Sequence, residues 1–335
     1  MKDCSNDILN YHDDEVTLSL TTRENLRGNR DANRDRMKRG LEKNKKPKPD
    51  EFIIQGSYAM KTMTQHATND YDIDDGAAFA EEKLKDQNGT AFTPHQAKEM
   101  VRDALVEGGG LAEDPIVKKN CVRVKYAAGH HVDIPVYRIR GSSSSAKKEL
   151  AGEEWRDSNP TEITDWFRRE EKNTHLQGEA EPQVRRLVRH VKRNSRCNLE
   201  GKSPSGLILT ILTAEQHKNY DSREDRVLRE VLRKIRDRLL VDSVVRNPAN
   251  SSEILTRAKD VEKINAFIDQ IASSLKTLEV LDKSSCRRSE ALKAWKTVLK
   301  TDYFNGEIDK AETDEKSHAA AAVAATTYVP KPWSF

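Results

Sequence analysis

The chain has few cysteines, and they show no paired spacing. The four are spread over 335 residues at Cys4, Cys121, Cys197 and Cys286. Zinc-binding cysteines recur in closely spaced pairs, and small secreted folds carry many more cysteines per residue. We therefore expect neither a zinc site nor a disulfide framework, and the cysteine content fits a reducing cytosol.

Long apolar runs and a strong net charge are also missing. No run approaches the roughly 18 apolar residues of a membrane-spanning helix, and the start of the sequence, MKDCSNDILNYHDDE, lacks the apolar region of a signal peptide. The 58 basic residues nearly balance the 55 acidic ones, which leaves a formal net charge of +3. We expect a cytoplasmic protein with no membrane partner. The charge balance is not that of a dedicated nucleic-acid coat, although it leaves room for local basic surfaces.

Two helices are predicted in the first half of the chain. Residues 14–46 contain no proline and are rich in Arg, Lys, Asn and Leu, which predicts one long helix with a solvated charged face. Residues 93–109 begin with a Thr cap and a Pro and end at Gly, which predicts a second helix.

Strand patterns separate these helices. The apolar run 51–56 and the alternating run 70–80 each predict one strand. Residues 116–140 predict two strands joined as a hairpin at Ala128-Gly129, and residues 141–155 predict a loop.

After about residue 180 the apolar spacing becomes helical throughout. Five helical segments are predicted, at residues 182–195, 203–218, 223–240, 251–281 and 289–304. The fold class is therefore α+β, with a core at residues 1–180 that includes the N-terminal helix, an all-helical lobe at 181–318 and a flexible tail at 319–335.

The strand at residues 70–80 crowds acidic side chains together. Asp72 and Asp74 project from one face with Asp70, because residues two apart in a strand share a face, while Asp75 points the other way. Carboxylates a few ångströms apart repel unless a cation neutralises them, and hard divalent cations prefer oxygen ligands. Asp133 is the sole acid in an apolar strand pattern and supplies a third carboxylate if the two strands are neighbours.

The Gly56-Ser57 turn lies just upstream of these acids. Its small residues let backbone N–H groups approach a phosphate, and the following helix start would face the same anion. A phosphate turn followed by three acids suits metal-assisted nucleotidyl transfer. In that reaction one metal lowers the pKa of the attacking hydroxyl and another stabilises the leaving pyrophosphate.

Each of these features has a simpler interpretation. Gly-Ser pairs are common in plain turns, acids beside Gly often cap turns, and Asp133 could be an edge-strand acid that faces water. His130 and His131 precede Asp133, but with no Cys partner we interpret them as structural or solvated. The order of the features favours the nucleotidyltransferase interpretation.

The segments QGSYAMKT, DIDDG and VDIPVY, within residues 55–137, resemble the bacterial cGAS/DncV-like nucleotidyltransferases, and the similarity is greatest to the cyclic GMP-AMP synthase branch. The resemblance implies a polymerase-β-like core with a mixed sheet and a helical lobe. It also implies a cleft between them that holds two Mg²⁺ ions (or Mn²⁺) and ATP and/or GTP. The implied activity is synthesis of a cyclic di- or trinucleotide messenger in anti-phage signalling, with the downstream effector reached through the product.

The resemblance also assigns residues. The triphosphate-binding turn would be formed by Gln55, Gly56, Ser57, Tyr58, Ala59 and Met60. The metal ligands would be Asp72, Asp74 and Asp133. Other nucleotide contacts would come from Arg123, Lys192, Ser205 and Asp302. From the residues alone, Lys192 could be one solvated charge among several arginines, Ser205 a helix cap and Arg123 a strand-surface residue.

Two other functions stay open at this point. One is a linear nucleotidyltransferase of the tRNA-end or antibiotic type, and the other is a non-catalytic nucleotide-binding regulator, which the three acids argue against. The C-terminal VPKPWSF resembles an end that a conjugating enzyme attaches to other molecules, but it ends in Phe rather than a small residue. We favour a tail that packs Trp333 and Phe335 into a surface groove.

Overall fold

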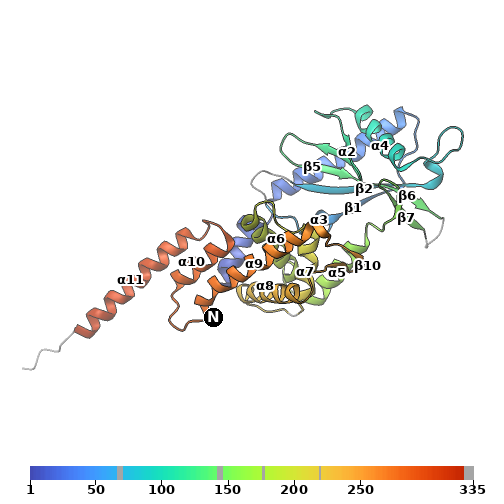
Figure 1. The fold of residues 1–335 in the computed structure, drawn as a ribbon. Coiled ribbons are helices and arrows are strands. Elements are labelled where there is room, and N and C mark those ends of the chain that lie inside the picture. Colours follow the sequence, from blue (N-terminus) through green and yellow to red (C-terminus); the bar gives the residue numbers. More distant parts are fainter. Residues whose placement is uncertain (66–70, 142–145, 176–177, 219, 328–335) are drawn as a thin grey trace, which may run out of the picture.

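A computed structural model of the protein describes residues 1–65, 71–141, 146–175, 178–218 and 220–327, and no side chains after residue 321. The predictions for Asp70, Trp333 and Phe335 therefore lie outside the described residues. Figure 1 shows a sheet covered on one side by α2 (Leu20–Lys43) and α4 (Pro94–Gly108), and a second body made of helices. We call the first body the core and the second body the helical lobe.

The main sheet has eight strands in the described residues. They are β1 (Glu51–Gln55), β2 (Asp72–Ala80), β3 (Ile116–Val117), β4 (Val122–Lys125), β5 (His131–Ile134), β6 (Val136–Arg140), β7 (Lys147–Ala151) and β8 (Trp155–Asp157). Strand β2 lies in the middle. It pairs antiparallel with β1 and parallel with both β5 and β6, so the sheet is mixed.

Two predictions about this sheet are wrong. Residues 116–140 form four strands rather than two, because the turn at residues 118–121 separates β3 from β4 and Pro135, which has no N–H, separates β5 from β6. The predicted hairpin β4–β5 is confirmed. Residues 141–155 are not all loop, because β7 pairs with the open edge of β6 and buries Leu150 and Ala151.

Helices α2 and α4 pack closely against each other. A Cβ on Gly40 would lie 1.8 Å from the carbonyl oxygen of Ala104, so only glycine allows this approach. The predicted helix at 93–109 is confirmed, with a capping box between Thr93 and Gln96. The helix predicted from residue 14 begins only at Leu20, because the Ser19 hydroxyl accepts a hydrogen bond from the Thr22 amide and caps it.

Short helical turns occur in both bodies. In the core they are α3 (Gly56–Ala59) and η2 (Glu81–Lys83), and in the helical lobe they are the π-turn η1 (His12–Val16), η3 (Ala258–Asp260) and η4 (Leu278–Asp282). The longer helices of the lobe are α1 (Ser5–Tyr11), α5 (Glu162–Thr174), α6 (Gln183–Leu199), α7 (Gly206–Gln216), α8 (Glu224–Val241), α9 (Val261–Thr277), α10 (Arg288–Leu299) and α11 (Asn305–Thr327).

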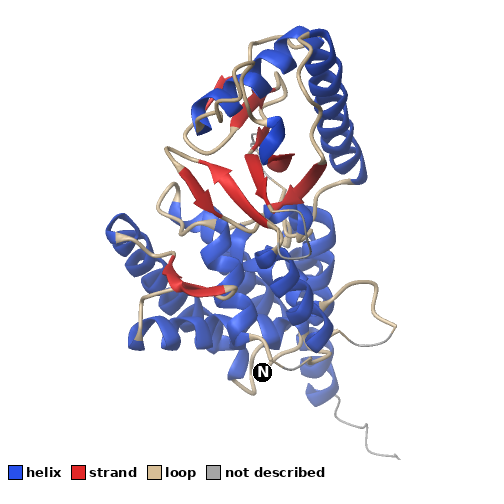
Figure 2. Ribbon diagram, turned by 90° about the vertical axis from the view of Figure 1, so that its right-hand side faces the viewer, coloured by secondary structure: helices blue, strands red, loops and turns tan. Residues whose placement is uncertain are grey.

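The helical lobe also contains a small hairpin, β9 (Arg246–Asn247) and β10 (Asn250–Ile254), seen beside the helices in Figure 2. The helix predicted at 251–281 therefore begins only at Val261. The tail predicted from residue 319 is helical as far as Thr327, where it continues α11. Among the described residues, no helix is long and apolar enough to cross a membrane.

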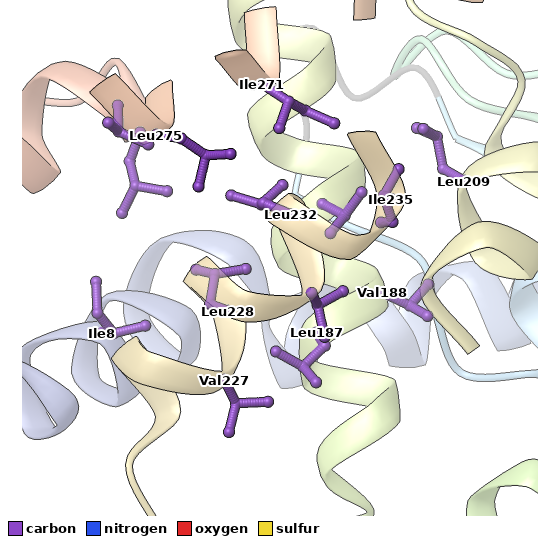
Figure 3. Packing of buried hydrophobic residues seen from close by; sticks show 14 of the residues in the cluster. Ile8, Leu187, Val188, Leu209, Val227, Leu228, Leu232, Ile235, Ile271 and Leu275 are labelled. Carbon is purple, nitrogen blue, oxygen red and sulfur yellow. The ribbon is translucent and has the colours of Figure 1, made fainter. Parts of the chain in front are cut away.

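The apolar cores do not divide at residue 180. Figure 3 shows Ile8 of α1 beside Leu228 of α8, within the large cluster of the helical lobe. Phe167 of α5 belongs to the same cluster, whereas a second cluster around Phe79 fills the space between the sheet, α2 and α4. Helix α1 thus packs with the helical lobe, whereas α2, which lies within the predicted N-terminal helix at residues 14–46, packs on the sheet. The division at residue 180 stays a prediction about domains.

Candidate active site

The acidic site is built by the parallel pairing of β2 and β5. Asp74 lies directly opposite Asp133, and Asp72 lies opposite His131. The sequence analysis expected Asp133 to join Asp72 and Asp74 if their strands are neighbours, and the structure shows that they are. Each of Asp72, His131 and Asp133 offers one ligand atom, and these atoms all lie within 4.8 Å of one another. The pairing brings carboxylates from two strands together on one face of the sheet.

Asp74 joins this group from the side of the Gly56-Ser57 turn. Burial raises its pKa to about 6, and the negative charges of Asp133 and Asp72 act in the same direction. A Cβ on Gly56 would lie 2.3 Å from a carboxylate oxygen of Asp74. The turn and the acid are therefore in direct contact, as a site for a metal-bound phosphate requires.

Asp75 points to the opposite face of β2, as strand alternation predicts. Its buried carboxylate accepts hydrogen bonds of 2.7 and 2.5 Å from the Arg34 guanidinium of α2. This acid therefore ties the sheet to the covering helix and takes no part in the site.

Arg123 lies next to the acids, on β4 opposite Asp133. Its guanidinium donates two hydrogen bonds of 2.7 Å to the two oxygens of Asp133, and it also lies 3.8 Å from Asp72. The bonds to Asp133 raise the pKa of Arg123 above its ordinary value. Arg123 is thus held at the acid cluster, and its predicted phosphate contact stays a prediction.

The two neighbouring histidines differ. His130 is buried, bonds to the Asn29 side chain at 2.6 Å and stacks on Tyr126, so for it the structural interpretation holds. His131 instead forms an ion pair with Asp72 inside the acid cluster. The sequence interpretation missed this residue. Strand alternation was the available signal, because His131 stands two residues before Asp133 and shares its face.

The remaining residues of the turn connect the two bodies. The Gln55 side chain accepts a hydrogen bond of 2.9 Å from Tyr137, and the Arg30 guanidinium lies over the Tyr58 ring. Ser57 and Ala59 lie in the four-residue helix α3, and Met60, just beyond it, is buried in the cluster of the helical lobe. The predicted turn thus spans the junction between the sheet and the helices.

Helix α6 holds the segment that follows this turn, residues 61–65. Arg189 donates to the Lys61 carbonyl at 2.7 and 3.0 Å, and the Lys192 ammonium donates to the carbonyl and hydroxyl of Thr62 at 3.2 and 2.9 Å. The Thr62 amide in turn donates to the Ser57 carbonyl at 2.9 Å. One face of α6 is therefore linked by hydrogen bonds to the predicted phosphate turn.

Lys192 is buried rather than solvated. Burial, together with the positive charges of Arg196 and Arg189, lowers its pKa to about 7. Its ammonium approaches the first turn of α7, where Ser205 is the N-cap and accepts a hydrogen bond from the Ile208 amide at 3.3 Å. The structure thus brings Lys192 and Ser205 together near the turn.

Asp302 is not brought into this group. It is exposed on the connection between α10 and α11, and its hydrogen-bond and ion-pair partners in the described chain, Lys296 and Asn305, belong to the same two helices. Its predicted nucleotide contact has no support from these contacts.

The contact between Gly56 and Asp74 gives the first testable prediction. Gly56→Ala combines a left-handed backbone, φ +63°, with a clash against Asp74, so its cost should exceed the about 1–2 kcal/mol of backbone strain alone. Gly89→Ala is the matched control, because Gly89 has φ +82° and nothing within 4 Å of its added Cβ. Urea unfolding measures both variants, and equal losses of stability would show that Asp74 yields without cost.

The sequence is similar to a known family of proteins. Residues 50–137 match the family model described as "Cyclic GMP-AMP synthase DncV-like, nucleotidyltransferase domain". A cyclic GMP-AMP synthase of Escherichia albertii is 28% identical over 252 residues, which cover 72% of this chain and 52% of that protein. The chain thus spans about half the length of this curated relative.

Solved structures match nearly the whole chain. The CD-NTase CdnG of Bradyrhizobium diazoefficiens in complex with GTP has a TM-score of 0.68 at 14% identity, over 92% of this chain and 98% of that chain. Escherichia coli DncV with 3′-deoxy GTP has a TM-score of 0.65 at 17% identity, over 88% and 94%. Escherichia coli CdnC with ATP has a TM-score of 0.65 at 13% identity, over 89% and 98%. These matches confirm the predicted fold class.

Proposed function

We propose that this chain, whose residues 50–137 match the nucleotidyltransferase domain of the DncV-like family, is a cyclic-oligonucleotide synthase that uses ATP and/or GTP. The single observation that carries the proposal is the convergence of Asp72 and Asp74 on β2 with Asp133 on β5, beside the Gly56-Ser57 turn. The structural relatives that hold GTP, 3′-deoxy GTP and ATP support the choice of substrate class.

The donor set fits divalent cations. The carboxylates of Asp72 and Asp133 and the imidazole of His131 lie within reach of one another, and Asp74 lies opposite Asp133 in the same pairing. Burial is the largest cause of the raised pKa of Asp74, and the repulsion from Asp133 and Asp72, which a bound cation would relieve, adds to it. Asp72, Asp74 and Asp133 would hold two Mg²⁺ ions. When bound, these ions would lower the pKa of the acceptor hydroxyl and neutralise charge on the leaving pyrophosphate.

The residues around the acids would bind and orient the donor nucleotide. The N–H groups at the Gly56-Ser57 turn and the Ser57 hydroxyl would contact the triphosphate. Lys192 would approach it from α6, exchanging its bonds to Thr62 for bonds to phosphate, and Ser205 would orient the start of α7 beside it. The hydrogen bonds from α6 to residues 61–65 would keep these groups in register across the junction.

The reaction would consist of two transfers. A ribose hydroxyl of the acceptor nucleotide would release its proton to solvent and attack the α-phosphate of the donor. A P–O bond would form, and pyrophosphate would leave with the electrons of the broken P–O bond. The linear product then turns round in the site, and a second attack of the same kind closes the ring. We place this messenger in bacterial anti-phage signalling on the resemblance to the DncV-like family.

One experiment separates this proposal from its alternatives. The protein is incubated with radiolabelled ATP and GTP and Mg²⁺, then with phosphatase. A phosphatase-resistant product is expected, because a closed ring carries no terminal phosphate. A product that phosphatase degrades fully would indicate a linear transferase, and binding without any product would indicate a nucleotide-binding regulator. Either result would overturn the proposal.

The C-terminal segment gives the second prediction. Deleting residues 319–335 should change nucleotide synthesis less than twofold, because the described part of this segment continues α11 away from the sheet (Figure 1). Initial rates of the truncated and full chains measure the effect. A large loss of rate at an unchanged melting temperature would show that the segment reaches the site. Attachment of this end by a conjugating enzyme stays a proposal.

A further inference from the structure

The histidine in the acid cluster has a defined position. His131 lies opposite Asp72 in the β2–β5 pairing, and its Nε2 forms an ion pair with the Asp72 carboxylate. The His131 side chain is only 12% exposed, whereas that of Asp72 is 60% exposed. The imidazole is therefore held against the sheet while the carboxylate opens toward solvent, which places a nitrogen donor at the inner wall of the site.

The position of Asp133 adds a third donor. It follows His131 by two residues on β5 and faces the same way, and its carboxylate is fixed by the two hydrogen bonds from Arg123. A carboxylate bound in this way keeps free lone pairs for a cation. Ligands of one cation at about 2.1 Å lie at most about 4.2 Å apart, so the three donor atoms need only small rotations from their present separations of up to 4.8 Å.

The chemistry of these donors differs between cations. Mg²⁺ demands near-ideal octahedral geometry, dehydrates reluctantly and takes oxygen ligands, so a neighbouring imidazole contributes little to its binding. First-row transition cations accept both oxygen and nitrogen donors, and Mn²⁺ shares with Mg²⁺ the affinity for carboxylate and phosphate oxygens. A site of two carboxylates and one imidazole therefore suits Mn²⁺ better than Mg²⁺.

From this geometry we propose that His131 is a metal ligand that completes the Asp72–Asp133 site with nitrogen and makes the protein prefer Mn²⁺ to Mg²⁺. This inference rests on the proposed function for the presence of a cation at these acids. It goes beyond that function in assigning His131 to the metal and in naming the preferred cation. An imidazole that only oriented Asp72 by a hydrogen bond would affect both cations alike.

The test uses the full chain without nucleotide. Mn²⁺ binding is titrated by electron paramagnetic resonance, and Mg²⁺ binding is measured by competition. His131→Asn should weaken Mn²⁺ binding by about 10- to 100-fold, the range that loss of a residue supporting a metal site produces, and should change Mg²⁺ binding less than about threefold. An equal loss for the two cations would assign His131 to orienting Asp72 and overturn the proposal.

The chain offers a matched control. His95 lies on the exposed surface of α4, where its Nε2 is 3.3 Å from Glu99, so it is also a histidine beside one carboxylate. No second acid joins that pair among the described metal-binding groups. His95→Asn should leave both affinities unchanged, and a loss of Mn²⁺ affinity in this variant would show that single histidine–carboxylate pairs account for the binding.

A direct readout does not depend on any variant folding. Pulsed resonance of bound Mn²⁺ should show coupling to a histidine nitrogen in the unmodified protein, and the coupling should change on ¹⁵N-labelling of histidine. The absence of such coupling, or of Mn²⁺ binding, would overturn the proposal. If labelled nucleotides still yield a cyclic product in that case, only the role of His131 fails. Nitrogen coupling without any product would instead count against the proposed function alone.

Discussion

Asp72→Asn combined with Asp74→Asn should reduce nucleotide transfer by a factor on the order of 10³ or more, because the metal contribution to such reactions is several kcal/mol. The measurement is product formation per minute with saturating nucleotide and Mg²⁺. Metal-dependent stabilisation by nucleotide, read from the melting temperature, should disappear together with the activity. Full activity in this variant would remove the two acids from the site.

The same variant should not be less stable without metal. The pKa of Asp74 is raised to about 6 in the folded protein, and an unfolded Asp titrates near 3.9. The unfolded chain thus releases this proton at lower pH than the folded chain, so the group lowers the free energy of unfolding as the pH rises from about 4 to 6. Removing the charges removes this penalty, and at pH 7 the metal-free variant should unfold at equal or higher urea concentration.

Asp75→Asn provides the contrast within the same strand. This acid is buried on the opposite face and holds Arg34 by two hydrogen bonds. Breaking a buried ion pair by removing one partner costs about 3 kcal/mol or more, so Asp75→Asn should unfold at a much lower urea concentration. Metal affinity in the remaining folded protein should be preserved. Loss of metal binding at unchanged stability would reverse the assignment of the two faces.

Lys192→Met should weaken the binding of nucleoside triphosphate by about 10- to 100-fold, because a hydrogen bond to a charged group contributes about 1.5–3 kcal/mol. Titration calorimetry with a non-hydrolysable triphosphate measures the affinity. Lys202→Met is the matched control, since this lysine is exposed and pairs with Glu262 at the surface. Unchanged affinity in Lys192→Met would make this lysine an anchor for Thr62 only.

Lys192 should also affect how the free energy of unfolding of the nucleotide-free protein depends on pH. Its pKa is lowered to about 7, whereas an unfolded lysine titrates near 10.4. Between these values the unfolded chain binds a proton that the folded chain does not, so Lys192 makes the free energy of unfolding rise with pH across this window. Lys192→Met should lack this rise. Urea unfolding at pH 7 and pH 10 measures it, and parallel changes in the two proteins would contradict the burial of an uncharged lysine.

Local sequence signals were enough for part of this molecule. The Thr93 cap and the Pro94 start define α4, and strand alternation placed Asp72 and Asp74 on the face opposite Asp75. The parallel pairing that sets Asp133 beside them could only be stated as a condition, because register depends on strands far apart in the chain. Some residues of the site were assigned only from the resemblance. They stay predictions wherever the structure shows no contact that supports the assignment.

Other features depended on tertiary contacts that no local pattern carries. The sequence of strand β7, KKELA, is mostly polar and does not predict a strand. The strand forms because it pairs with the open edge of β6, where Leu150 becomes buried. Lys192 looked solvated among arginines, yet α6 turns it toward Thr62, and the long helix expected at residue 14 is interrupted by the Ser19 cap. Helical spacing indicates which face is apolar but not which partner covers it.

The packing of α1 has a consequence for the order in which the protein folds during synthesis. The Cys4 amide donates to the carboxylate of Asp225, 221 residues later in the chain. At about 5–20 residues per second, α8 is synthesised on the order of ten to forty seconds after α1, and during that time the apolar face around Ile8 has no native cover. The sheet with α2 and α4 is complete by residue 157 and can fold first. The helical lobe is therefore the late, high-contact-order step, and the nascent α1 stays exposed to chaperones and to aggregation until α8 follows.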